Sequence, residues 1–159
     1  MLGTTRRRLL LGAALGCLAG SAVWVAGLLL TSIAGARGLG PFGEFLGALH
    51  STDAAHGRGA AMHYMLSDQA AALGARMALL EFFTFVLPAC LVAGVVGGMT
   101  ARSGPRVSLA VGALASAGPL LLSLNHLSLY LAGPLLPCTL CAAVGAMTAL
   151  GVSVIRRSR

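Results

Sequence analysis

Four long apolar stretches constrain the fold of this chain more than any other feature of its sequence. They cover residues 9–33, 77–99, 107–126 and 136–155, and no charged residue occurs between Arg8 and Arg37. A helix needs about 20 apolar residues to cross the hydrocarbon core of a bilayer. We therefore predict an all-α, polytopic membrane protein, with a single transmembrane domain over residues 1–159 that forms a four-transmembrane-helix bundle.

The composition excludes soluble and disordered proteins. Hydrophobic residues make up 57% of the 159-residue chain, and charged residues make up only 9%. A soluble domain carries about 25% charged residues to solvate its surface, and disordered chains are also rich in charge. The lipid bilayer is therefore the expected environment.

The distribution of arginine predicts the orientation in the membrane. The sequence has no lysine, and eight of its 11 arginines cluster beside apolar stretches, at positions 6–8, 102 and 106, and 156, 157 and 159. Cytoplasmic loops carry such an excess of basic residues, whereas a nucleic-acid-binding protein gathers them on one face. We expect a multi-pass protein of a bacterial-type cytoplasmic (inner) membrane, with both termini cytoplasmic and no nucleic-acid partner.

The beginning of the chain also has features of an export signal. Residues 5–10 resemble a twin-arginine motif, and Ala34-Gly35-Ala36 resembles a signal-peptidase site. The apolar stretch has about 24 residues, however, and the apolar region of an ordinary signal peptide has about 7–15. We expect the first helix to remain uncleaved.

Small residues recur at four-residue spacing in every apolar stretch. Such ridges allow transmembrane helices to pack closely, although a chain rich in Ala and Gly also produces the spacing by chance. Pro88 and Pro119 should kink the second and third helices. The ridges are Gly12, Gly16 and Gly20; Cys90, Gly94 and Gly98; Ser108, Gly112 and Ser116; and Cys141, Gly145 and Ala149.

Residues 34–76 form the only long connection, and we expect it on the outer side. Phe42, Phe45, Leu46 and Leu49 follow a helical i, i+3, i+4, i+7 pattern, and residues 60–73 can form a second helix. Short amphipathic helices of this kind should lie on the membrane surface or cap the bundle.

The pair Cys138 and Cys141 is the sharpest chemical motif in the sequence. Two cysteines at i and i+3 of a helix share a face and can close a disulfide or bind a soft metal. Pro134 and Pro137 precede them and suit a helix start, where free N–H groups and the helix dipole favour the reactive thiolate. The alternative is that both are small apolar residues that pack in a bundle.

This layout resembles the vitamin K epoxide reductase family. The resemblance rests on four spans, a long outer loop after the first helix, the string 128–131 (Ser-Leu-Tyr-Leu) and the Cys-x-x-Cys that opens the fourth helix; Gly57-Arg58-Gly59 is a weaker echo. The Pro-Cys-x-x-Cys string is also similar to the quinone-linked bacterial disulfide-bond oxidases. The first resemblance implies that Cys141 faces a quinone and that Cys138 exchanges with a second thiol pair.

The sequence also departs from that family. Residues 34–76 contain no second cysteine pair, and Cys17 and Cys90 lie within predicted spans, so we expect that neither replaces it. Gly145 stands where the family commonly has a tyrosine. Either an outer thioredoxin-like protein supplies the missing thiols, or the chain is a relative or look-alike without the full activity.

Further candidate residues lie near the predicted outer face. Asn125 and His126, with Tyr130 beyond them, could contact a quinone head group or the cysteine pair. Glu81, just inside the second span, is a functional candidate that could instead pair with Arg76. His50, His56 and His63, with Met62 and Met65, carry ligand types suited to copper or haem iron, but their spacing matches no familiar metal site. Histidines on a loop are more often simply solvated.

Two classes of function remain open from the sequence. One is a membrane thiol–disulfide oxidoreductase that passes electrons from an outer dithiol to a membrane quinone through Cys138 and Cys141. The alternative is a non-catalytic accessory or structural subunit, whose ridges of small residues pack against a larger membrane complex. Gly12, Gly16 and Gly20 are the residues expected to matter most for that assembly.

Overall fold

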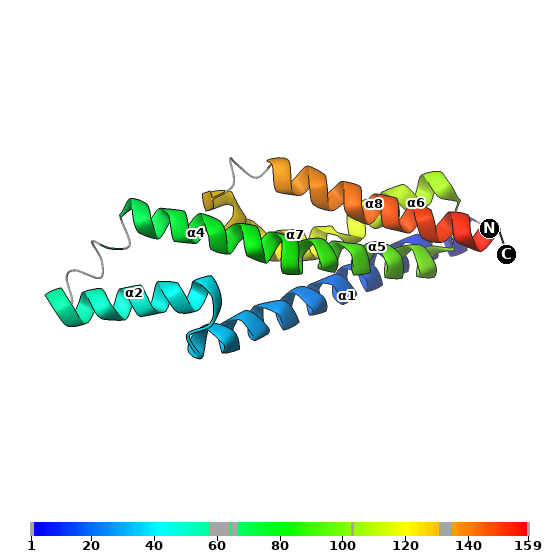
Figure 1. Cartoon of the computed structure of the whole chain (residues 1–159). Coiled ribbons are helices and arrows are strands. Elements are labelled where there is room, and N and C mark those ends of the chain that lie inside the picture. The colour runs from blue at the N-terminus through cyan, green and yellow to red at the C-terminus, as the bar shows by residue number, and fades with distance from the viewer. Residues whose placement is uncertain (1, 58–63, 65–66, 103, 131–134, 159) are drawn as a thin grey trace.

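A computed structural model of the chain describes residues 2–57, 64, 67–102, 104–130 and 135–158. Side chains are described for these residues except 2–5, 124–130 and 135–137. Helices form nearly all of this part of the chain, and it contains no strand (Figure 1). The elements are α1 (Leu2–Ala36), α2 (Gly40–His56), α4 (Asp68–Glu81), the π-helix η1 (Phe82–Val86), α5 (Leu87–Ala101), α6 (Pro105–Ala115), α7 (Ala117–Tyr130) and α8 (Leu135–Arg157).

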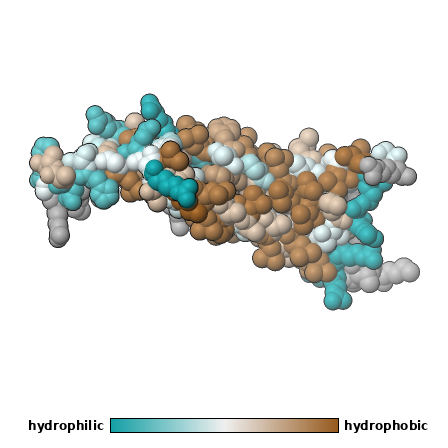
Figure 2. All heavy atoms as spheres, turned by 60° about the horizontal axis from the view of Figure 1, so that its bottom comes forward, coloured by the Kyte–Doolittle hydropathy of each residue, from teal (hydrophilic) through white to brown (hydrophobic). Residues whose placement is uncertain are grey.

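Four helical segments are long and apolar enough to cross a membrane. They are Arg6–Ala36, Asp68–Ala101, Pro105–Ser123 and Cys138–Arg157. Large apolar side chains on these segments point outward, among them Leu18 at 67% exposure and Met147 at 62%. Figure 2 shows the result as an apolar band between two hydrophilic ends. Lipid can solvate such a surface and water cannot, so the predicted all-α membrane bundle is confirmed.

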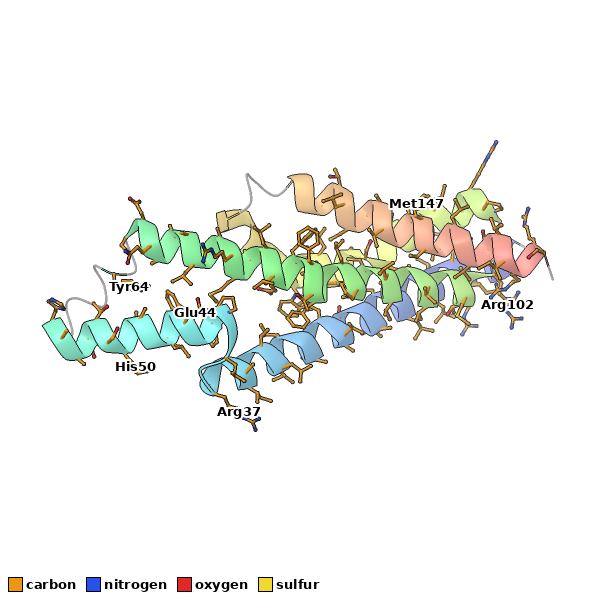
Figure 3. The ribbon with its side chains drawn as sticks, in the orientation of Figure 1. Arg37, Glu44, His50, Tyr64, Arg102 and Met147 are labelled. Carbon is orange, nitrogen blue, oxygen red and sulfur yellow. The ribbon has the colours of Figure 1, made fainter. Side chains whose placement is uncertain are left out.

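The two hydrophilic ends differ in charge. One, called here the arginine end, carries both termini and Arg102; the other, called the loop end, carries α2 and the beginnings of α4 and α8 (Figures 1 and 3). At the arginine end the Arg156 guanidinium donates a 2.9 Å hydrogen bond to the Met99 carbonyl, close to the last turn of α5. Arginine there satisfies one of the carbonyls that a helix C-terminus leaves without a helical partner.

The second membrane helix is longer than the sequence predicts. It begins at Asp68 rather than at Met77 and continues without interruption to Ala101. The Ser67 side chain caps its start by accepting a 3.3 Å hydrogen bond from the Ala70 N–H. The hydropathy pattern misses this start because the first two turns of α4 extend beyond the apolar stretch and carry polar residues.

Both expected proline distortions are present. Pro88 follows η1, in which the Leu87 N–H donates to the carbonyl of Phe82 five residues earlier. The third helix, predicted as one span over 107–126, breaks at Ser116, three residues before Pro119. At this break the Ser116 hydroxyl donates a 2.9 Å hydrogen bond to the Ala113 carbonyl. The π-helix before Pro88 and the break before Pro119 each accommodate a proline, which has no N–H to donate to the carbonyl of residue i−4.

The predicted small-residue ridges form the helix interfaces, and all twelve residues are buried. A β-carbon built on Gly16 would lie 2.5 Å from the Ala93 carbonyl oxygen, and one on Gly20 would lie 2.7 Å from that of Ala89. The first ridge therefore packs against α5 of the same chain. Close backbone contact within the bundle thus covers Gly12, Gly16 and Gly20, and a larger membrane complex as partner stays a prediction.

Helices α5 and α8 run in the same direction with their ridges in register (Figure 1). Gly94 contacts Gly145, and Gly98 contacts Ala149, at distances that leave no space for a further methyl group. The Gly145 backbone also contacts Gly112 of α6 from the other side. The backbone of Gly145 is therefore enclosed between two neighbouring helices.

A tight turn directs the chain from α1 back into α2. Gly38 and Gly40 have φ angles of +74° and +72°, which favour glycine, and Pro41 occupies the first turn of α2. The apolar stripe of Phe42, Phe45, Leu46 and Leu49 is half-buried, and Phe45 stacks at 6.3 Å against Tyr64. Helix α2 thus packs its apolar face against α1 and α4.

Trp24 provides a test of packing within the bundle. Its ring is buried in the core, and its Nε1 has no hydrogen-bond acceptor among the residues whose side chains the structure describes. We expect Trp24→Phe to change the free energy of unfolding by less than about 1 kcal/mol, because losing an unpaired N–H offsets the lost ring volume. Trp24→Ala should cost about 3–5 kcal/mol. Detergent-denaturation curves would measure both values, and equal losses would contradict this account.

Candidate functional site

The cysteine pair lies at the beginning of α8, at the loop end. The helix starts at Leu135, so Cys138 falls in its first turn and Cys141 falls one turn later. Pro137 is compatible with this position because the first N–H groups of a helix have no helical acceptor. Cys138 is half-buried and Cys141 is completely buried, so accessibility decreases from the first thiol to the second.

Cys90 of α5 contacts Cys141, which the sequence interpretation did not foresee. The two thiols share a hydrogen bond, and both side chains have 0% exposure. Cys90 is buried within the second membrane helix, so it does not stand in for the outer-loop cysteine pair, but it packs beside one member of the predicted motif. The signal was present in the sequence, because Cys90 and Cys141 are the first members of two ridges with the same spacing.

The surroundings of this thiol pair are apolar. The two cysteines belong to one buried cluster with Trp24, Phe82 and Val86. Half-buried Leu87, Leu120 and Val144 pack around this cluster. Such an environment excludes water from both thiols.

The other two cysteines differ in position, although all four are free thiols in this structure. Cys17 lies half-buried on α1, where its sulfur contacts Gly118 of α7. No cysteine lies beside it in the described part of the chain. Cys17 therefore provides an internal control for the reactivity of the other three.

The three residues predicted to contact a quinone all lie on helix α7. Asn125, His126 and Tyr130 belong to the second half of α7, which ends at Tyr130, at the end of the bundle where α8 begins. Their side chains are outside the described set, so their contacts with the cysteines remain a prediction.

The histidines remain separate from the thiol pair. His50 and His56 are exposed on α2, and His50 points away from the bundle in Figure 3, while His63 is outside the described residues. Among the residues that the structure describes, no group of three or more His, Cys, Asp or Glu side chains could hold a metal ion. A copper or haem role for the histidines remains a prediction without a structural site.

Glu81 contributes to a groove of about 170 Å³ between α2 and α4. The carboxylate is half-buried at the last residue of α4, directly before the π-helix. The groove is otherwise apolar and aromatic, and its lining residues are Phe42, Phe45, Ala70, Gly74, Met77, Ala78 and Glu81. Glu81 therefore lies in this groove, at the junction of α4 and the π-helix.

No protein-family model, curated protein or solved structure matches this chain. The resemblance to the vitamin K epoxide reductase family therefore rests on the topology and the short motifs alone. The positions of the Cys138 and Cys141 thiols at the start of α8 are the structural basis for a function.

Proposed function

We propose that this protein is a membrane thiol–disulfide oxidoreductase that takes electrons from an outer dithiol and passes them to a membrane quinone. The observation that carries the proposal is the graded burial of Cys138 and Cys141 at the start of α8. A disulfide exchanger at a membrane surface needs one thiol within reach of its substrate and a second that is shielded from water.

The depth of the two thiols fits this role if the arginine clusters mark the cytoplasmic side. Cys141 precedes Arg156 by about 15 residues, or about 22 Å of helix, and Cys138 by about 27 Å. The hydrocarbon core is about 30 Å thick. In this orientation Cys138 lies close to the outer surface and Cys141 lies one helical turn deeper.

The exchange follows from ordinary thiol chemistry. An outer thiolate attacks the Cys138 sulfur of a Cys138–Cys141 disulfide, and the Cys141 thiolate leaves. The second outer thiol then attacks the mixed disulfide, releasing an outer disulfide and two reduced cysteines. A quinone regenerates the pair by accepting two electrons and two protons. The residues proposed to contact it are Asn125, His126 and Tyr130.

Alkylation of native membranes tests the proposal. After denaturation of the membranes, we expect Cys138 and Cys141 to react with maleimide only if a reductant was added first, because in the resting enzyme they form a disulfide. Cys17 should react after denaturation whether or not a reductant was added. If Cys138 and Cys141 are always free thiols, the oxidoreductase proposal fails and the non-catalytic subunit becomes the better account.

The proposed orientation makes a separate prediction. A membrane-impermeant thiol reagent applied to intact, reduced cells should label Cys138 much faster than Cys17. Each arginine placed at the bilayer centre costs roughly 2.5–3.5 kcal/mol, so the clusters fix which helix ends stay inside. Labelling of Cys138 only after the membrane is broken would place the pair in the reducing cytoplasm and contradict the proposed function.

A further inference from the structure

We infer that Cys90 is a third redox thiol, which forms a disulfide with Cys141 and provides the buried route by which electrons leave the Cys138–Cys141 pair. This inference rests on the proposed function. It assigns a role to a residue that lies far from the motif in sequence and belongs to a different helix.

The first support is the contact itself. The two thiols share a hydrogen bond, and both have 0% exposure inside the same apolar cluster. Neither sulfur can therefore exchange with a water-soluble partner in this conformation. Each is, however, in position to react with the other.

The second support is the packing of α5 against α8. One turn below the thiols, the backbones of Gly94 and Gly145 are in direct contact, which brings the two helix axes unusually close. A disulfide needs its two α-carbons within roughly 4.4–6.8 Å and its β-carbons within about 4.5 Å. Glycine contacts one turn below Cys90 and Cys141 therefore hold the two helices close together next to the thiols.

The third support is the geometry of the two possible disulfides of Cys141, one to Cys138 in the same helix and one to Cys90 in another helix. Residues at i and i+3 of a regular helix have β-carbons about 5–6 Å apart, and a disulfide brings them to about 3.8 Å. The Cys138–Cys141 bond therefore distorts the first turns of α8. A bond between Cys90 and Cys141 joins two different helices, so it does not require two β-carbons of one helical turn to approach each other.

The proposed sequence balances electrons and protons. In the fully reduced state, the Cys90 and Cys141 thiols lose two electrons and two protons to a quinone, which gives a quinol and the Cys90–Cys141 disulfide. The Cys138 thiolate then attacks the Cys141 sulfur, forming the Cys138–Cys141 disulfide, and the Cys90 thiolate leaves and takes up a proton. The outer dithiol is oxidised by this second disulfide.

The competing explanation is that Cys90 and Cys141 are only small residues of two packing ridges. Alanine separates the two explanations because it keeps the small volume and removes the sulfur. Cys90 is flanked by fully buried Ala89 and Ala93, so α5 already accepts alanine along this interface. Cys90→Ala should therefore fold, with a thermal midpoint close to that of the unchanged chain.

The decisive measurement uses the purified full-length chain in lipid nanodiscs with a short-chain ubiquinone as the oxidant. In Cys138→Ser, which lacks the exchanging thiol, we expect quinone to trap the Cys90–Cys141 disulfide, detected by mass spectrometry of linked peptides. Cys138→Ser/Cys90→Ala should give no linked peptide. Failure to find the link in Cys138→Ser overturns the inference about Cys90.

Turnover with dithiothreitol and the same quinone separates this inference from the proposed function. Cys90→Ala should reduce quinone at least roughly tenfold more slowly, while its diamide-oxidised form still oxidises one equivalent of dithiothreitol at the unchanged rate. Cys17→Ala is the matched control and should retain full turnover. Unaltered quinone reduction by Cys90→Ala removes Cys90 from the pathway only, whereas no turnover by the unchanged chain removes the proposed function itself.

Discussion

Replacing Gly145 with leucine is expected to prevent the chain from assembling its bundle. A β-carbon built at this position would lie 2.5 Å from the Gly112 carbonyl oxygen and 2.7 Å from the Ser116 hydroxyl oxygen, and Gly94 packs on the opposite side. The Gly112 carbonyl is backbone, which cannot rotate away. Overpacking ordinarily costs about 1–3 kcal/mol, and here the cost should exceed about 3 kcal/mol because α5, α6 and α8 must all separate.

The same helix offers a matched control. Gly151 lies within α8, and a β-carbon built there meets no atom within 4 Å, so Gly151→Leu should be tolerated. The yield of monodisperse protein in mild detergent and its thermal midpoint measure both variants. If Gly145→Leu were as stable as Gly151→Leu, the close α5–α8–α6 packing described above would be incorrect.

Replacing Cys138 with alanine is expected to abolish dithiol oxidation. The proposed mechanism forms a covalent bond between Cys138 and the outer substrate, and no other described cysteine combines partial exposure with a neighbouring thiol. Removing a covalent nucleophile lowers a rate by at least about 10³-fold, and Cys141→Ala should have a similar effect because it removes the partner of the same bond.

A steady-state assay with dithiothreitol and short-chain ubiquinone measures this loss. Thermal midpoints should confirm that Cys138→Ala is folded, since Cys138 is half-buried near the helix start and tolerates a smaller side chain. Retention of more than about a tenth of the rate in Cys138→Ala would show that the exchange proceeds through another group, and the proposed mechanism would be wrong.

Much of the architecture is predictable because a bilayer imposes simple local requirements. Backbone groups in lipid must be satisfied within each segment, so a long apolar stretch becomes a helix whatever its neighbours are. The helix distortions near Pro88 and Pro119 follow from a missing N–H, which is also a local property. The start of α4 at Asp68 was not predictable from hydropathy, because its first turns are polar and lie outside the apolar stretch.

The sequence alone determined the four apolar helices, the arginine-rich ends and the ridges along which the helices pack. Only the tertiary structure decided which ridge meets which, and it paired the ridge of Cys90 with that of Cys141. The physical reason is that each ridge of glycine, alanine, serine and cysteine can approach any of the others closely. The pairing depends on how all helices fill the bundle together, and no single segment of the sequence encodes it.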